Sequence, residues 1–230
     1  MLNTFLKRNP TIGYCQGMNF IVGNLLKHLN EEESFWVFIQ IVENMLPIDY
    51  YSHMLGILTD QRIFNNLLTK RFPKLVAHMQ NHNYSLDLIA FQWLVTLFFN
   101  NVNHETETFI LTAFLLKGQK IIIRITLLIV DYLKDKIFKA DDFGAIYKIF
   151  SEDPFKEITP QILGKALKTK KLKITRKQLE AFREKVRPEI VAELQESLET
   201  NIDTKNSIER SKKFLNNFYL YRGLIKYYEN

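Results

Sequence analysis

Apolar residues recur at helical spacing along most of the chain. Ile21, Leu25 and Leu29 lie four residues apart, and Trp93 and Leu97 repeat that interval. Apolar residues at i, i+4 and i+7 form one face of an α-helix, whereas a half-buried strand alternates. The pattern predicts helices near 2–8, 12–29, 31–46, 60–72, 75–79, 85–97, 103–117, 119–135, 139–150, 175–198 and 214–228, and Thr159-Pro160 marks the start of another.

Capping and helix-breaking residues support several of these ends. Asn30 precedes three glutamates, and Thr175-Arg-Lys-Gln178 has the form of a capping box. Gly118 fits a helix C-cap, and Pro188 should kink or restart the long helix that contains it. A polar break is expected at 201–206.

The β-branched run from Ile121 to Val130 is a strand by propensity alone. It has no partner strand in sight among its helical neighbours, so we predict a helix there too. Eight glycines and six prolines in 230 residues are few for a turn-rich β-fold. The sequence therefore predicts an all-α protein, a multi-helix domain over 1–150 and a helical C-terminal extension over 151–230.

Basic residues concentrate in one short stretch. Residues 165–187 carry ten Lys or Arg against Glu180 and Glu184, a net charge of +8 (10 − 2), whereas the whole chain has +6. This stretch could bind an anionic membrane surface or phosphoinositide head groups. The favoured interpretation is a solvated linker and helix face, and nucleic-acid binding is not expected because no binding motif is present.

The single cysteine excludes an intramolecular disulfide and fits a reducing compartment. No apolar run reaches the roughly 18 residues needed to span a bilayer, and the N-terminal residues do not resemble a signal peptide. We therefore expect a cytoplasmic protein, with peripheral association with endomembranes as a possibility.

Three of the eight glycines, Gly13, Gly17 and Gly23, fall within residues 9–24. If this stretch is helical from Ile12, each costs about 1 kcal/mol relative to alanine. Such a cost suggests close approach by another backbone or by a bound partner.

Several kinds of chemistry are not supported in this stretch or elsewhere. No glycine-rich phosphate-binding pattern is present. Cys15 has no histidine close in sequence to act as a base, so a buried structural cysteine is expected. His78 and His82 lack a third ligand, so no metal site is expected. Trp36 and Trp93 lie on apolar stripes and are predicted to be core residues.

The segment Asn9-Pro-Thr-Ile-Gly-Tyr-Cys-Gln-Gly-Met-Asn19 resembles the Tyr-x-Gln motif of TBC domains, the Rab GTPase-activating domains. Further blocks resemble the same family in the same order, and the resemblance covers roughly residues 1–150. These blocks are Glu33-Ser-Phe-Trp36, Leu46-Pro47 with Tyr50-Tyr51, Met54 to Asp60, Phe91 to Phe98 and Phe114 to Gly118.

The resemblance implies an all-helical activator of a Rab-type GTPase in its GTP form, acting in vesicle trafficking. Gln16 would position the attacking water in trans, and Tyr14, Gly17 and Asn19 would contact the partner. No cofactor is implied for the chain itself, because GTP and Mg²⁺ would be bound by the GTPase.

The family's arginine finger lies in an Ile-x-x-Asp-x-x-Arg motif upstream of Tyr-x-Gln, and this motif does not occur in the chain. The chain is then expected to be either part of a longer protein or a member that lacks one finger. The alternative function is a Rab-binding or helical scaffold module without catalysis.

Overall fold

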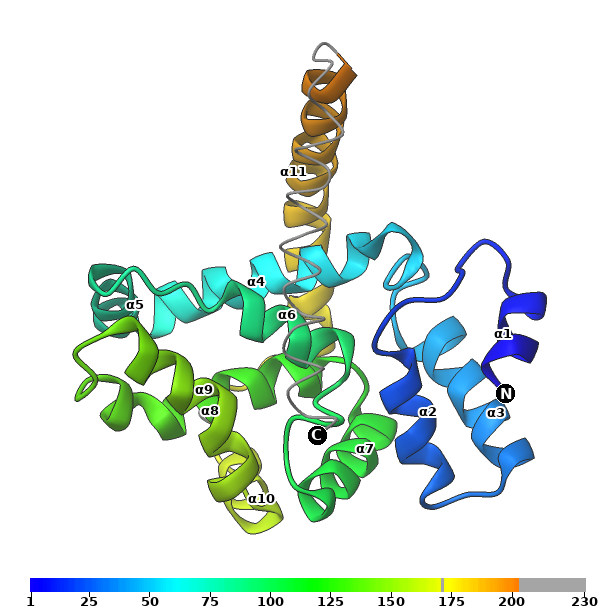
Figure 1. Ribbon diagram of the computed structural model, residues 1–230, viewed down its shortest axis with the longest axis horizontal. Helices are drawn as coiled ribbons and strands as arrows, with labels where there is room; N and C mark the ends of the chain where they lie inside the picture. The colour runs from blue at the N-terminus through cyan, green and yellow to red at the C-terminus, as the bar shows by residue number, and fades with distance from the viewer. Residues whose placement is uncertain (171, 203–230) are drawn as a thin grey trace. The chain divides into compact units, whose positions relative to one another are not determined.

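The computed structural model describes residues 1–170 and 172–202, and every regular element within them is helical (Figure 1). The predicted all-α class is therefore confirmed. The α-helices are α1 (Leu2–Arg8), α2 (Met18–Leu26), α3 (Glu31–Gln40), α4 (Leu55–Arg71), α5 (Pro73–Asn81), α6 (Asp87–Val95), α7 (His104–Lys117), α8 (Lys120–Ile137), α9 (Phe143–Glu157), α10 (Pro160–Lys168) and α11 (Arg176–Ile202). A π-helical turn (Ile41–Met45) follows α3, and a 3₁₀ turn (Ser52–Met54) precedes α4.

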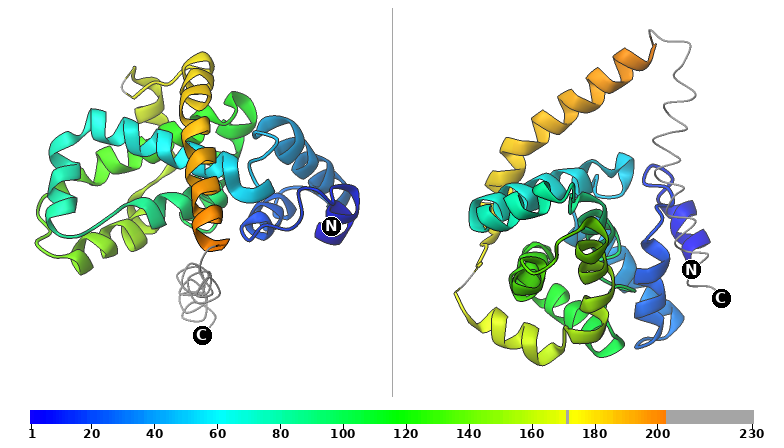
Figure 2. Two further views of the ribbon diagram at one scale, coloured as in Figure 1. Left: turned by 90° about the horizontal axis from the view of Figure 1, so that it is seen from above. Right: turned by 60° about the vertical axis from the view of Figure 1, so that its left-hand side comes forward.

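The central element is α8, which packs against α4, α5, α6, α7, α9 and α10 (Figure 2). Every residue from Ile121 to Val130 is buried, including Arg124 and Thr126. A helix surrounded by neighbours is apolar on all sides, which is why this run has strand-like composition. The prediction of a helix over the β-branched run is confirmed.

The N-terminal helices pack on one another. Phe5 of α1 meets Phe38 of α3 edge to face, with ring centroids 5.0 Å apart, and α2 packs along α3. The predicted start of α3 is confirmed as a capping box, because Asn30 accepts from the Glu33 N–H and the Glu33 side chain accepts from the Asn30 N–H.

Two other caps are also confirmed. Gly118 ends α7 with φ 72°, a backbone conformation that favours glycine. Thr175 and Gln178 exchange backbone and side-chain hydrogen bonds before α11. The helix continues through Pro188 and does not restart there.

Contacts within the chain group Met1–Arg187 into one compact unit and assign the chain from Pro188 onward to a second. Within the first unit α10 packs on α7 and α8. The boundary expected at 150 stays a prediction. The predicted helix at 214–228 lies outside the described residues, as does most of the predicted break at 201–206.

Trp36 and Trp93 were both predicted to be core residues, and the prediction is wrong for Trp36 and confirmed for Trp93. Trp93 is 2% exposed, whereas Trp36 is 53% exposed. The guanidinium of Arg8 lies 5.8 Å from the centre of the Trp36 ring. Trp36 therefore does not belong to the buried face of α3, which includes the fully buried Phe38. Helical spacing placed Trp36 beside the apolar stripe of α3, but it does not specify the width of that stripe.

One residue of the basic stretch 165–187 forms a buried ion pair within the domain. The favoured interpretation, a solvated linker and helix face, did not predict this. Arg183 of α11 forms a bidentate ion pair with Asp60 of α4, with Nε–Oδ1 and Nη2–Oδ2 distances of 2.8 Å. Asp60 is fully buried, and Gln119 hydrogen-bonds to both side chains. Burial raises the pKa of Asp60, and the hydrogen bond and charge of Arg183 oppose that shift.

We expect Arg183→Met to lower the free energy of unfolding at pH 7 by about 3–5 kcal/mol, because it leaves the Asp60 carboxylate buried without its cation. The raised pKa of Asp60 determines how the loss depends on pH. A carboxyl whose pKa is higher in the folded than in the unfolded state destabilises the fold as pH rises from the unfolded pKa through the folded one. Urea unfolding between pH 4 and pH 8 should therefore show a larger deficit at the higher pH.

Arg176→Met is the matched control, since Arg176 pairs with Glu180 on the exposed face of the same helix. That pair should contribute at most about 0.5 kcal/mol. Equal effects of the two substitutions would show that the Asp60–Arg183 pair has no special importance for stability.

The second prediction for the fold concerns two glycines. A Cβ at Gly56 would lie 2.7 Å from the Cα of Tyr50, whereas one at Gly23 meets nothing within 4 Å. Gly56→Ala should cost about 1–3 kcal/mol, because the obstacle is backbone, and Gly23→Ala should gain up to about 1 kcal/mol from helix propensity. Thermal unfolding of both variants checks this, and a neutral Gly56→Ala would contradict it.

Candidate functional site

The predicted site lies in a loop just before α2, not within a helix. Gly13 has φ 69° and Gly17 has φ 117°, and α2 begins only at Met18. The expected helix from Ile12 is therefore wrong: two of the three glycines supply backbone conformations that a helix cannot contain. Gly23 alone of the three lies within α2. We call residues 13–17 the Gln16 loop.

Buried residues on both sides hold Gln16 at the surface. Cys15 is 4% exposed and Met18 is fully buried, whereas Gln16 is exposed. The Cys15 N–H donates to Met18 Sδ at 3.5 Å, and the Met18 N–H donates to the Cys15 carbonyl at 3.1 Å. The Gln16 backbone is thus fixed at each end while its side chain remains free to meet a partner.

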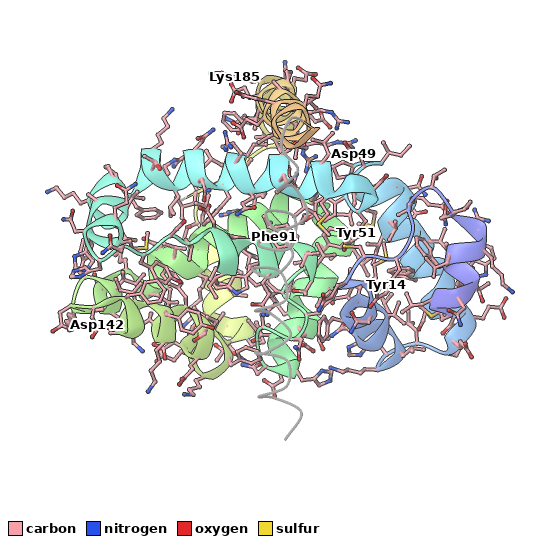
Figure 3. The ribbon with its side chains drawn as sticks, turned by 45° about the horizontal axis from the view of Figure 1, so that its top comes forward. Tyr14, Asp49, Tyr51, Phe91, Asp142 and Lys185 are labelled. Atoms are coloured by element: carbon pink, nitrogen blue, oxygen red, sulfur yellow. The ribbon has the colours of Figure 1, made fainter. Side chains whose placement is uncertain are left out.

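Gly17 rests directly on the end of α6. A Cβ added to Gly17 would stand 3.0 Å from the carbonyl oxygen of Val95. The Tyr51 hydroxyl donates to that same oxygen at 3.1 Å, and the Tyr50 hydroxyl donates to the Leu94 carbonyl at 3.0 Å. Figure 3, in which Tyr14 and Tyr51 are labelled, shows this junction between the N-terminal helices and the rest of the domain.

The structure brings together the residues predicted to surround Gln16. The Asn19 side-chain oxygen accepts from the Gly17 N–H at 3.2 Å and from the Tyr14 hydroxyl at 3.4 Å. Tyr14 is 53% exposed, and partial burial raises the pKa of its hydroxyl. Tyr14 therefore keeps its proton at neutral pH and presents a polar, uncharged surface beside Gln16.

This group of side chains contains an amide and a phenol but no general base. Burial raises the pKa of the Cys15 thiol to about 11, so it is not a nucleophile at neutral pH. The prediction of a buried, structural Cys15 is confirmed. Within residues 1–170 and 172–202, no three His, Cys, Asp or Glu side chains group to hold a metal ion. A glutamine amide can donate and accept a hydrogen bond at once, so it can orient a water molecule.

A hollow of about 530 Å³ lies beside the loop, lined in part by Thr11, Ile12, Glu43 and Asp49. Ile48, at its edge, is 83% exposed. Its lining is mixed, with two carboxylates and an exposed aliphatic side chain. A partner that approaches Gln16 would also meet this surface.

The sequence alone missed the roles of Tyr50, Tyr51 and Val95. The tyrosine pair was noticed as part of a family-like block, but its hydrogen bonds reach α6, 44 residues farther along. No local pattern around the two tyrosines specifies an acceptor so far along the chain.

The chain belongs to the RabGAP-TBC family, described as the Rab-GTPase-TBC domain, which matches residues 1–138.

Relatives share this region. TBC1 domain family member 2B of Mus musculus is 38% identical over 149 residues, which are 64% of this chain and 15% of that protein. TBC1 domain family member 2A of Mus musculus is 38% identical over 150 residues, which are 64% of this chain and 16% of that protein. The chain therefore spans about a sixth of the length of these curated relatives.

The crystal structure of the Chlamydomonas flagellar RabGAP TBC domain superposes with a TM-score of 0.66 at 25% identity. The match covers 73% of this chain and 56% of that one. The all-helical TBC fold expected from the motifs is thus confirmed. In the described part of the chain, no helix combines the length and apolarity required to cross a membrane.

The burial of Cys15 in the Gln16 loop predicts that its thiol reacts slowly. With a pKa of about 11 against an ordinary 9.0, the folded protein should hold about a hundredfold less thiolate near pH 8 than an exposed cysteine. Labelling with Ellman's reagent should be slow in the native protein. Gly17→Ala should speed it, because a Cβ cannot fit against the Val95 carbonyl at φ 117° without moving the loop.

Gly13→Ala is the matched control, since Gly13 also has positive φ but meets nothing within 4 Å. It should leave the Cys15 labelling rate close to that of the wild type. If Gly17→Ala labels as slowly as Gly13→Ala, the contact with Val95 does not hold the loop in place.

Proposed function

We propose that this chain activates GTP hydrolysis by a Rab-type GTPase in its GTP form, and thereby regulates vesicle trafficking. Gln16 is the residue that it supplies. The supporting observation is the exposure of Gln16 between two buried neighbours, Cys15 and Met18, on a loop fixed against α6. The GTP and Mg²⁺ belong to the partner.

In this proposal the Gln16 amide enters the nucleotide site of the GTPase and orients the attacking water. Phosphoryl transfer requires positioning and electrostatic stabilisation more than covalent chemistry from the protein, so a group with no acid or base function suffices. A side chain whose backbone is already fixed loses less freedom when it docks, which favours the transition state.

Tyr14, Gly17 and Asn19 form the contact surface around Gln16 in this proposal. The Asn19 oxygen fixes the Gly17 N–H, and the Tyr14 ring is exposed beside it. Gly17 itself is buried against the Val95 carbonyl, so its part in this surface is to let the loop lie on α6 and hold Gln16 in place.

A second candidate function is a module that binds the GTP form without accelerating hydrolysis. These 230 residues contain no Ile-x-x-Asp-x-x-Arg motif, so in the first proposal an arginine finger would have to come from outside them. An arginine finger is worth roughly 10³–10⁵ in rate in related systems, so Gln16 without one would give only modest acceleration.

We predict that Gln16→Ala lowers the acceleration of single-turnover GTP hydrolysis at least about tenfold, because the water loses its orienting group. Affinity for the GTP form should change little, since most of the contact surface remains. The measurement is phosphate release from a panel of GTP-loaded Rab proteins, with affinity measured separately by a pull-down or by fluorescence anisotropy.

Gln161→Ala is the matched control, because Gln161 is an exposed glutamine on α10. It should leave both rate and affinity unchanged. Binding of a Rab without acceleration by the wild type would support the second candidate. Acceleration that survives Gln16→Ala would remove Gln16 from the mechanism.

A further inference from the structure

A second hollow, of about 610 Å³, lies between α7, α8 and the residues that follow α10. Such a volume falls within the range of about 300–1,000 Å³ that is common for small-molecule sites. Phe109, Ala113, Ile121, Leu167 and Ile174 supply much of its lining. The hollow therefore offers an apolar interior that could accommodate a hydrocarbon chain.

Cations surround this apolar lining. Lys117 closes α7, Lys120 opens α8, Lys173 follows α10, and Arg124 lies beneath them. No Asp or Glu lines the hollow among the described residues. The hollow beside the Gln16 loop differs in this respect, since Glu43 and Asp49 line it.

Arg124 helps to build the hollow. It is only 8% exposed, and its Nη2 donates to the Thr169 carbonyl at 2.6 Å. This bond ties the C-terminal end of α10 to the central helix α8, where a cation also complements the helix dipole. The position of the chain that forms one wall is thereby fixed.

The lysines at the rim are free to bind an anion. Within residues 1–170 and 172–202, neither Lys117, Lys120 nor Lys173 forms a side-chain ion pair. By contrast, Lys27, Lys134 and Lys136 each hold a carboxylate. Three ammonium groups without a carboxylate partner around one apolar hollow make its surroundings positive, which favours an anionic ligand.

Exposed leucines extend the apolar surface out of the hollow. Leu116 is 74% exposed and Leu115 is 41% exposed, in the last turn of α7. At a membrane interface, an exposed leucine beside a lysine can place its aliphatic part in the acyl region while the ammonium group reaches the phosphates.

We propose that the hollow between α7, α8 and α10 binds an anionic lipid of a membrane surface. Lys117, Lys120 and Lys173 contact the head-group phosphate, and the apolar lining with Leu116 receives part of an acyl chain. This inference does not rest on the proposed GTPase-activating function, because the hollow shares no lining residue with the Gln16 loop. It assigns part of the basic stretch, Lys173, to a defined site.

The test is flotation of the full chain with phosphatidylcholine vesicles, with and without phosphatidylserine. The chain should float only with the anionic vesicles. Lys117→Ala with Lys120→Ala should lower the partition coefficient at least about tenfold, since each lysine near an anionic surface contributes about fivefold.

Lys70→Ala with Lys74→Ala is the matched control, because it removes the same charge from exposed positions in α4 and α5. It should lower partitioning much less. An equal loss in both double variants would overturn the site in favour of general attraction between a basic protein and an anionic surface.

Leu116→Ser tests the apolar contact without changing charge. It should weaken flotation several-fold, whereas Leu26→Ser, at another exposed leucine, should not. Unchanged flotation of Leu116→Ser would overturn the acyl contact. Failure of the wild type to float with anionic vesicles would overturn the proposal and leave the hollow to a protein segment. Circular dichroism of each variant checks that the fold is retained.

Discussion

Two buried tyrosine hydroxyls at the end of α6 determine how the N-terminal helices join the rest of the domain. The last carbonyl groups of a helix have no partner within it, and Tyr50 and Tyr51 donate to those of Leu94 and Val95. Burial raises the pKa of both hydroxyls well above the ordinary value, so they remain protonated donors at neutral pH. The same Val95 carbonyl leaves room beside it only for glycine at position 17, and the place of the Gln16 loop follows from this.

Charge is divided between the two hollows of the domain. The hollow next to the Gln16 loop has carboxylates in its lining, and the hollow between α7, α8 and α10 has only cations as its charged groups. The two carboxylates already pair with Arg8 and Arg187, so the charge that is available to a ligand lies at the second hollow. Electrostatic complementarity of this kind affects encounter rates and orientation more than it affects affinity. The proposed lipid contact and the proposed contact at Gln16 use different residues of the domain.

The sequence predicted the features that depend on residues close together in the chain. Caps at Asn30, Gly118 and Thr175 were recognisable because each motif satisfies backbone groups within a few residues. The composition of α8 and the burial of Cys15 followed from the surrounding sequence. The Gln16 loop was misassigned because periodicity registers apolar spacing and not the sign of φ, so two glycines with positive φ were read as part of a helix. The bonds from Tyr50 to α6 and from Arg183 to Asp60 join residues 44 and 123 positions apart, and no local pattern in a single sequence specifies such pairs.

The ion pair between Asp60 and Arg183 bears on how the domain can be cut. The family match ends at residue 138, yet the cation that neutralises a fully buried aspartate of α4 lies at residue 183. A fragment trimmed to the matched region would keep the carboxylate and lose its counter-charge. It would also lose α10, which covers part of α7 and α8. A piece that keeps this ion pair therefore has to extend into α11, 45 residues beyond the end of the family match (183 − 138).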